Sequence, residues 1–309
     1  MYDQLPLDGM PRRLYSCTPS RLNTWLDCRR RYRFTYLDRP QPAKGPGWAH
    51  NSVGASVHNA LAAWWREPYE RRTSLTAAIL LTNGWITEGF RDAEQSGRHL
   101  ERARDLVSGY VATLDPADEP VGVERTVATR TKVISVSGRI DRLDRRGDEL
   151  VVVDYKTGKR PLTKDDARFS LALALYAVAA SRVLRTPCHA VELHHLPTGE
   201  IVEWRHTDDS LRRHLERAEE IALEAAAADD AYRARAGVPA PRQGGSASKV
   251  AVGASGGADA PVPAEADPEI DRVFAPSPGP ICSWCDFRRH CPEGQAAAVD
   301  RQPWEGLAE

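Results

Sequence analysis

The chain lacks a long apolar run, and no stretch approaches the roughly 18 apolar residues that a membrane-spanning helix needs. Its opening segment, MYDQLPLDGMPRRLY, contains no apolar core of the kind found in a secretory signal. Net charge is also nearly absent, because 42 Lys and Arg offset 43 Asp and Glu and leave −1. A nucleic-acid partner would therefore have to bind at a local basic patch. We expect a cytoplasmic protein.

A G-x-x-x-x-G-K-[ST] loop is also missing. The pair Gly158-Lys159 has neither the preceding glycine nor the following hydroxyl residue that such a loop requires. The chain therefore carries no ATP-driven motor of its own. Its 41% hydrophobic and 28% charged residues are ordinary for a globular protein.

The order of the periodic segments predicts one mixed α/β core flanked by N- and C-terminal pieces. Apolar periodicity predicts helices over residues 20–37, 53–65, 74–113, 165–184 and 208–235. Alternating β-branched and polar residues predict strands within 121–154 and 190–204. A segment rich in Gly, Ala, Pro and Ser predicts a flexible linker. These features divide the chain into residues 1–235, 236–268 and 269–309.

Two carboxylates and a lysine occur within the predicted strands. A turn at Gly147-Asp148 would place Asp141 opposite Asp154, with Cβ atoms roughly 5 Å apart. Like charges this close need a neutralising partner, and hard oxygen ligands suit Mg²⁺ or Mn²⁺. Lys156 leaves the same face of its strand as Asp154. Together these groups suit phosphodiester hydrolysis, in which a metal activates water and the lysine orients it or neutralises the phosphate.

A surface hairpin with a salt bridge is the simpler interpretation of a D-x-K triplet. Here, however, residues 150–153 are apolar on both faces, which is typical of a central strand buried on both sides. Charges at the end of such a strand are costly unless they are paired or coordinated. The pattern therefore favours a metal site.

These motifs resemble the core of the RecB-family exonucleases in the PD-(D/E)XK nuclease superfamily. The resemblance rests on G54-A-S-V57-H58, G138-R-I-D141-R-L-D144 and V153-D154-Y155-K156-T157-G158. It implies a restriction-endonuclease-like mixed sheet and a DNA nuclease that uses Mg²⁺ or Mn²⁺. It also implies metal ligation by His58, Asp141, Asp154 and the carbonyl of Tyr155, and catalytic roles for His58, Asp141, Asp154 and Lys156.

One position departs from the family pattern, which continues with a helix bearing Q-L-x-x-Y. Tyr176 fits the tyrosine, but the glutamine position is Ala172. The missing amide could weaken substrate positioning, although it removes no metal ligand.

The cysteine spacing points to a second cofactor. Six cysteines in a reducing compartment favour a metal site or redox chemistry over disulfides. Cys282, Cys285 and Cys291 form a compact trio, and a C-x2-C spacing alone fits zinc and iron–sulfur equally well. Cys28 lies far upstream, which is less typical of a zinc finger. Cys17 and Cys188 fit no pattern and are expected to be buried thiols.

The arrangement of one early and three late cysteines resembles the iron–sulfur staple of AddB-type nucleases and of CRISPR adaptation nucleases. It implies a 4Fe–4S cluster on Cys28, Cys282, Cys285 and Cys291 that ties the first helix to the tail. Arginines flank these cysteines and would then form one patch that either grips phosphates or is simply solvated: Arg29, Arg30, Arg31, Arg33, Arg288 and Arg289. Tyr32 or Trp284 could stack on bases there.

Three functions follow from these features. The leading hypothesis is a nuclease acting on single-stranded DNA or DNA ends in repair, recombination or CRISPR adaptation. The second is a nuclease-weak iron–sulfur protein that holds DNA ends for a helicase or an integrase. An RNA-directed nuclease is the third.

Overall fold

The computed structural model describes residues 14–237 and 267–307. The linker predicted over residues 236–268 therefore lies almost wholly outside the described residues.

A mixed six-stranded sheet forms the centre of the fold, and its main path runs β1-β3-β4-β5-β6, with β2 paired to β3. The strands are β1 (Tyr15–Cys17), β2 (Gly122–Arg130), β3 (Ile134–Arg146), β4 (Glu149–Lys156), β5 (Ala190–His195) and β6 (Glu200–Arg205). The pairs β1–β3 and β4–β5 are parallel, and the other pairs are antiparallel. This mixed sheet is the fold class expected from the sequence.

The β3–β4 hairpin has the predicted register. Arg146 pairs with Glu149 across the turn, and the ladder continues to Arg142 opposite Val153. Gly147 sits in the turn at φ +60°, a left-handed conformation that glycine adopts without a steric penalty. β4 lies between β3 and β5, and its residues 150–153 are all buried. Its position explains why this segment is apolar on both faces.

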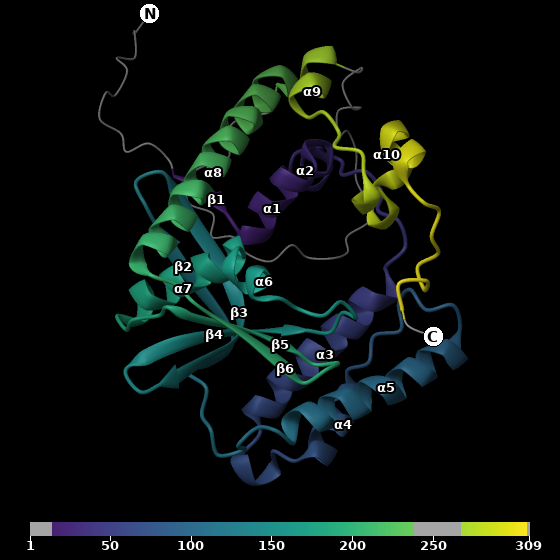
Figure 1. The fold of residues 1–309 in the computed structure, drawn as a ribbon. Helices are drawn as coiled ribbons and strands as arrows, with labels where there is room; N and C mark the ends of the chain where they lie inside the picture. Colours follow the sequence, from purple (N-terminus) through teal and green to yellow (C-terminus); the bar gives the residue numbers. More distant parts are fainter. Residues whose placement is uncertain (1–13, 238–266, 308–309) are drawn as a thin grey trace, which may run out of the picture.

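Helices cover both faces of the sheet (Figure 1). The helices are α1 (Pro19–Asp27), α2 (Arg29–Tyr36), α3 (Ala49–Arg66), α4 (Ser74–Asn83), α5 (Ala93–Val111), α6 (Lys164–Arg168), α7 (Leu171–Leu184), α8 (Asp208–Ala236), α9 (Pro268–Val273) and α10 (Pro292–Ala297). Alternation along β4 sends Val152 toward α7 and Val151 and Val153 toward α3, α4 and α5.

The sequence predicted one continuous helix over residues 74–113, but the segment forms two helices, α4 and α5. Gly84 ends α4, and the Asp92 side chain caps α5 by accepting from the Gln95 N–H. The intervening loop packs on the start of α3, where the Ser52 hydroxyl donates to the Glu88 carbonyl at 2.8 Å. Helix propensity depends on the local sequence and cannot predict this tertiary contact. The loop between α4 and α5 was therefore not predicted.

Two further predicted helices are also interrupted. The segment 165–184 divides between α6 and α7, where the Ser170 hydroxyl caps α7. The segment 20–37 divides at Cys28, whose backbone is extended between α1 and α2. Thr18 caps α1, and Pro19 occupies the first helical position. The short strand β1 was not predicted.

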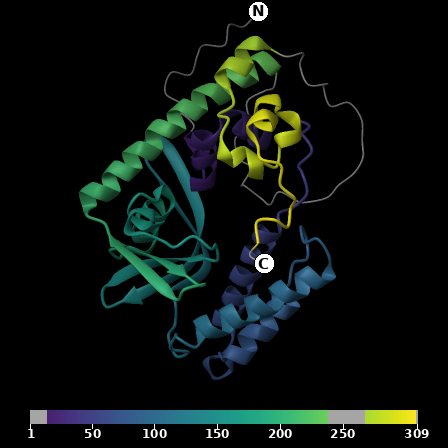
Figure 2. The same cartoon turned by 45° about the vertical axis from the view of Figure 1, so that its right-hand side comes forward.

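Segments from the N-terminal and C-terminal parts of the chain pack together beside α8. α1, α2, α8 and α9 share one apolar cluster with β1, and the C-terminal segment lies next to α2 in both views (Figures 1 and 2). Buried Asp229 of α8 accepts from Tyr32 of α2 at 3.0 Å and from Arg21 of α1 at 2.7 Å. No described helix is long and apolar enough to cross a membrane.

Candidate functional site

Four of the side chains predicted from the sequence come together where β3 and β4 meet α3. Asp141 lies one residue beyond the pair Arg142–Val153 that ends the β3–β4 ladder, and Asp154 and Lys156 follow on β4. His58 lies in the middle of α3. Residues separated by nearly 100 positions thus share one end of the sheet.

Asp141 connects the other groups of the site. Its Oδ2 accepts a hydrogen bond from the Tyr155 backbone N–H at 3.0 Å and lies 3.3 Å from His58 Nδ1. The Tyr155 ring packs edge-on against the His58 ring with centroids 5.8 Å apart. The backbone of β4 therefore fixes the carboxylate, and a buried aromatic ring fixes the imidazole.

Asp154 and Lys156 form an ion pair, with the lysine Nζ 2.5 Å from Asp154 Oδ2. Burial raises the pKa of Asp154, and the nearby Asp141 charge raises it further, while Lys156 opposes both effects. A carboxylate held this way needs a nearby positive charge to stay ionised. Either Lys156 or a bound cation can supply it.

Glu124 of β2 is a further acidic residue at the site, and the sequence analysis did not identify it. Single ligand atoms of His58, Glu124 and Asp141 all lie within 4.8 Å of one another, close enough to hold one metal ion. Val123 and Arg125 pair with Arg142 and Ile140, so Glu124 stands across from Asp141. Extending the register argument to this preceding strand could have revealed it.

The backbone at Glu124 is unusual, with φ +50° in the left-handed region that non-glycine residues rarely adopt. Such conformations cost on the order of 1–3 kcal/mol and concentrate at functional sites. Arg139 pairs with Glu124 at 2.6 Å. Burial raises the pKa of Glu124 against the influence of Arg139.

The pKa of His58 reflects opposing effects. Burial alone would lower the pKa, but the hydrogen bond to Asp141 and the charges of Asp141, Asp154 and Glu124 raise it above the ordinary value. The carboxylates around His58 therefore favour positive charge at the site. Because an imidazole must be deprotonated to bind a metal, a divalent cation would compete with protons there.

Two glycines allow close packing around the site. A β-carbon on Gly54 of α3 would lie 3.3 Å from Thr157 Oγ1, and one on Gly138 of β3 would lie 2.3 Å from Tyr176 Cε1. Tyr176 therefore crosses β3 over Gly138. Burial is the main cause of the raised pKa of the Tyr176 phenol, and the negative charges of Asp154 and Asp141 raise it further.

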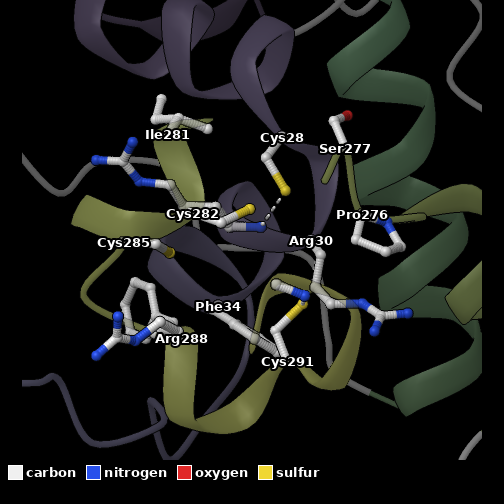
Figure 3. Close-up of a pocket in the computed structure, with 13 residues that line it drawn as sticks. Cys28, Arg30, Phe34, Pro276, Ser277, Ile281, Cys282, Cys285, Arg288 and Cys291 are labelled. Carbon is white, nitrogen blue, oxygen red and sulfur yellow. Dashed lines mark hydrogen bonds between the residues drawn. The ribbon is translucent and has the colours of Figure 1, made fainter. Parts of the chain in front are cut away.

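Four cysteines from the two ends of the chain line one pocket (Figure 3). Cys28 lies between α1 and α2, and Cys282, Cys285 and Cys291 lie in the C-terminal segment. The Arg31 N–H points to the Cys28 Sγ at 3.4 Å, and the Gly294 N–H to the Cys291 Sγ at 3.3 Å. Such N–H donors suit thiolates that ligate a cofactor.

All six cysteines are free thiols. Cys17 and Cys188 are buried in apolar clusters away from the pocket, as predicted, and burial raises the pKa of Cys17 to about 11 and that of Cys188 to about 12.

The arginines beside these cysteines are mostly neutralised. Pairs form between Arg29 and Glu224, Arg30 and Glu293, Arg33 and Asp271, and Arg288 and Asp300. Three of these acidic partners lie on α8, α9 and α10, so their proximity could not be read from the local sequence. The predicted basic patch is therefore less available to phosphates than its composition suggests.

The sequence profile of the PD-(D/E)XK nuclease superfamily matches residues 16–292. The chain belongs to this superfamily. A crystal structure of a protein from Eubacterium rectale described as "Putative exonuclease" is similar over 78% of this chain and 90% of that one, with a TM-score of 0.44 and 10% identity. No curated protein matched the sequence.

PD-(D/E)XK nucleases use divalent metals, and the acidic end of β3 and β4 has donors that fit one. His58, Glu124 and Asp141 supply an imidazole and two carboxylates, a donor set that can hold a divalent cation. Asp154 adds a third carboxylate next to Lys156.

Proposed function

We propose that this chain is a metal-dependent deoxyribonuclease of the RecB-like type, acting on single-stranded DNA or DNA ends. The observation that supports this most strongly is the convergence of His58, Asp141 and Glu124 on a space suited to one cation, beside the Asp154–Lys156 pair. In this proposal Asp141, Asp154, His58 and the Tyr155 carbonyl hold the metal, as the sequence motifs imply, and Glu124 adds a further carboxylate ligand.

Each group has a defined task in this proposal. The bound metal would lower the pKa of a water molecule and stabilise charge on the phosphate. Lys156 orients that water or neutralises the scissile phosphate, since its ammonium lies at the same end of β4. Asp141 is held by the Tyr155 N–H and in turn orients His58.

Cleavage of end-labelled DNA tests the proposal. Anaerobically purified protein is incubated with single- or double-stranded DNA and Mn²⁺ or Mg²⁺, beside Asp154→Asn, which preserves the shape of the side chain. We expect metal-dependent products from the native chain and none from the variant. DNA binding without cleavage by either protein would instead favour a nuclease-weak partner of a helicase or integrase, and Ala172 would then mark the loss of substrate positioning.

We propose that Cys28, Cys282, Cys285 and Cys291 hold a 4Fe–4S cluster. The four cysteines line one pocket, although one comes from the N-terminal helices and three come from the C-terminal segment. Zinc fingers usually draw their ligands from local spacings, so this arrangement supports a cluster. A β-carbon on Gly294 would lie 3.2 Å from the Cys291 Sγ and 3.8 Å from the Cys282 Sγ, so glycine keeps space open beside these sulfurs.

Iron and acid-labile sulfide analysis tests the cluster. We expect close to four of each per chain, with visible absorption lost in Cys291→Ser. Cys188→Ser is the matched control, because Cys188 is buried in the core on α7's side of the sheet. Stoichiometric zinc without iron in protein purified anaerobically would contradict the cluster.

A further inference from the structure

A basic and aromatic groove of about 390 Å³ lies where α6, β6 and the start of α8 meet. Val151 pairs with Ala190, and Ala190 pairs with Arg205 of the groove. Lys156 stands five residues further along β4, so the groove and the candidate active site are at opposite ends of the sheet. At about 3.3 Å per residue the separation along the strand is about 17 Å.

The groove offers an aromatic platform. The Phe169 side chain is 63% exposed, which is unusual for a residue of this size. The Arg168 guanidinium lies 4.9 Å from the Phe169 ring centroid and 5.1 Å from that of Trp204. The Trp204 indole N–H is buried without a hydrogen-bond partner in the described part of the chain. A ligand with a flat ring could stack on the exposed face of Phe169.

The groove also carries cations that no carboxylate neutralises. Within the described ranges, neither Arg168 nor Arg213 is in an ion pair, in contrast to the paired arginines beside the cysteines. The two aspartates that begin α8 already have partners, Asp208 with His189 and Asp209 with Arg212. The first backbone N–H groups of the 29-residue α8 add a positive field at the same place.

We propose that this groove binds single-stranded nucleic acid, with a base stacked on Phe169 and phosphates on Arg168 and Arg213. The proposal rests on the nuclease function and extends its substrate. A single strand is required because only an unpaired base presents a free face to an aromatic side chain. A strand that occupies the groove and also reaches the candidate active site has to cover about 17 Å along β4.

Binding of fluorescent dT20 in EDTA, measured by anisotropy without cleavage, tests the groove. We expect Phe169→Ala to weaken binding at least about fivefold, because stacking of one base is lost, and Phe169→Trp to restore it. Arg213→Gln should weaken binding and reduce the slope of log K against log salt by about 0.7. Arg212→Gln on the same helix removes the same charge from an already paired side chain and should leave affinity unchanged.

Unchanged affinity in Phe169→Ala and Arg213→Gln would overturn the proposal, as would equal losses in Arg212→Gln and Arg213→Gln. Both failures are distinguishable from failure of the nuclease function. If the groove proposal is wrong and the nuclease function is right, Asp154→Asn still abolishes cleavage. If the nuclease function is wrong, dT20 binding still depends on Phe169 while no protein cleaves.

Discussion

His58 Nδ1 and Asp141 Oδ2 lie 3.3 Å apart, although one residue belongs to a helix near the N-terminus and the other to the central sheet. Both side chains are partly exposed, at 29% and 16%. In the proposed metal site both atoms would face one cation, together with Glu124.

His58→Ala should weaken Mn²⁺ binding by at least about 10-fold, since losing even an outer-sphere partner of a metal site costs about 10- to 100-fold. Isothermal titration of the metal measures this directly. His50→Ala on the same helix is the control, because His50 packs against Trp48 and Trp284 instead of the site. Equal affinities in native protein and His58→Ala would remove His58 from the ligand set.

Lys156→Met should lower the cleavage rate by about 10²–10³-fold, the usual effect of removing one group that stabilises developing charge. Mn²⁺ affinity should change little, because the metal itself supplies the positive charge that Asp154 needs. A rate close to native at saturating metal would contradict the role given to Lys156.

Glu124→Gln should reduce metal affinity and preserve the fold, because the amide keeps the size of the side chain. Glu124→Gly should reduce affinity equally but raise the stability relative to Glu124→Ala by on the order of 1 kcal/mol, since glycine relieves the left-handed backbone. Urea denaturation compares the Gly and Ala variants. If Ala is as stable as Gly, the backbone at this position carries no strain.

Gly138→Ala should destabilise the protein by about 1–3 kcal/mol, because the added carbon would lie 2.3 Å from the Tyr176 ring. The loss should shrink in the background of Tyr176→Ala, and this double-variant cycle measures the contact. Additive losses would show that Tyr176 moves away without cost.

Acid should lower the free energy of unfolding through Glu192 of β5, whose buried carboxylate is hydrogen-bonded to Arg146 and His194. Although burial opposes ionisation, these two partners lower its pKa from 4.5 to about 2. The stabilisation is thus present above pH 4.5 and is lost as the pH falls toward 2. The stability difference between the native chain and Glu192→Gln, on the order of 3 kcal/mol near neutrality, should shrink over this range. A stability difference that stays constant as the pH falls would contradict this role of the Glu192 carboxylate.

The sequence was sufficient to predict the features that depend on local spacing. The turn at Gly147 set the β3–β4 register, and the apolar run ending at Val153 identified the central strand. Glu124 was not predicted because the left-handed backbone that presents its side chain to the site cannot be read from residue spacing, although the β2–β3 register places it across from Asp141. The neutralisation of Arg29 and Arg30 depends on Glu224 and Glu293, which only the tertiary fold brings near them.

The central claim is that one metal-dependent centre forms around Asp141. Its most direct test combines Mn²⁺ counting by electron paramagnetic resonance with cleavage of single-stranded DNA, for the native chain and Asp141→Asn. The account predicts that bound Mn²⁺ and cleavage are lost together in the variant, with the fold intact. Full cleavage by Asp141→Asn, or cleavage by the native chain in EDTA, would contradict it.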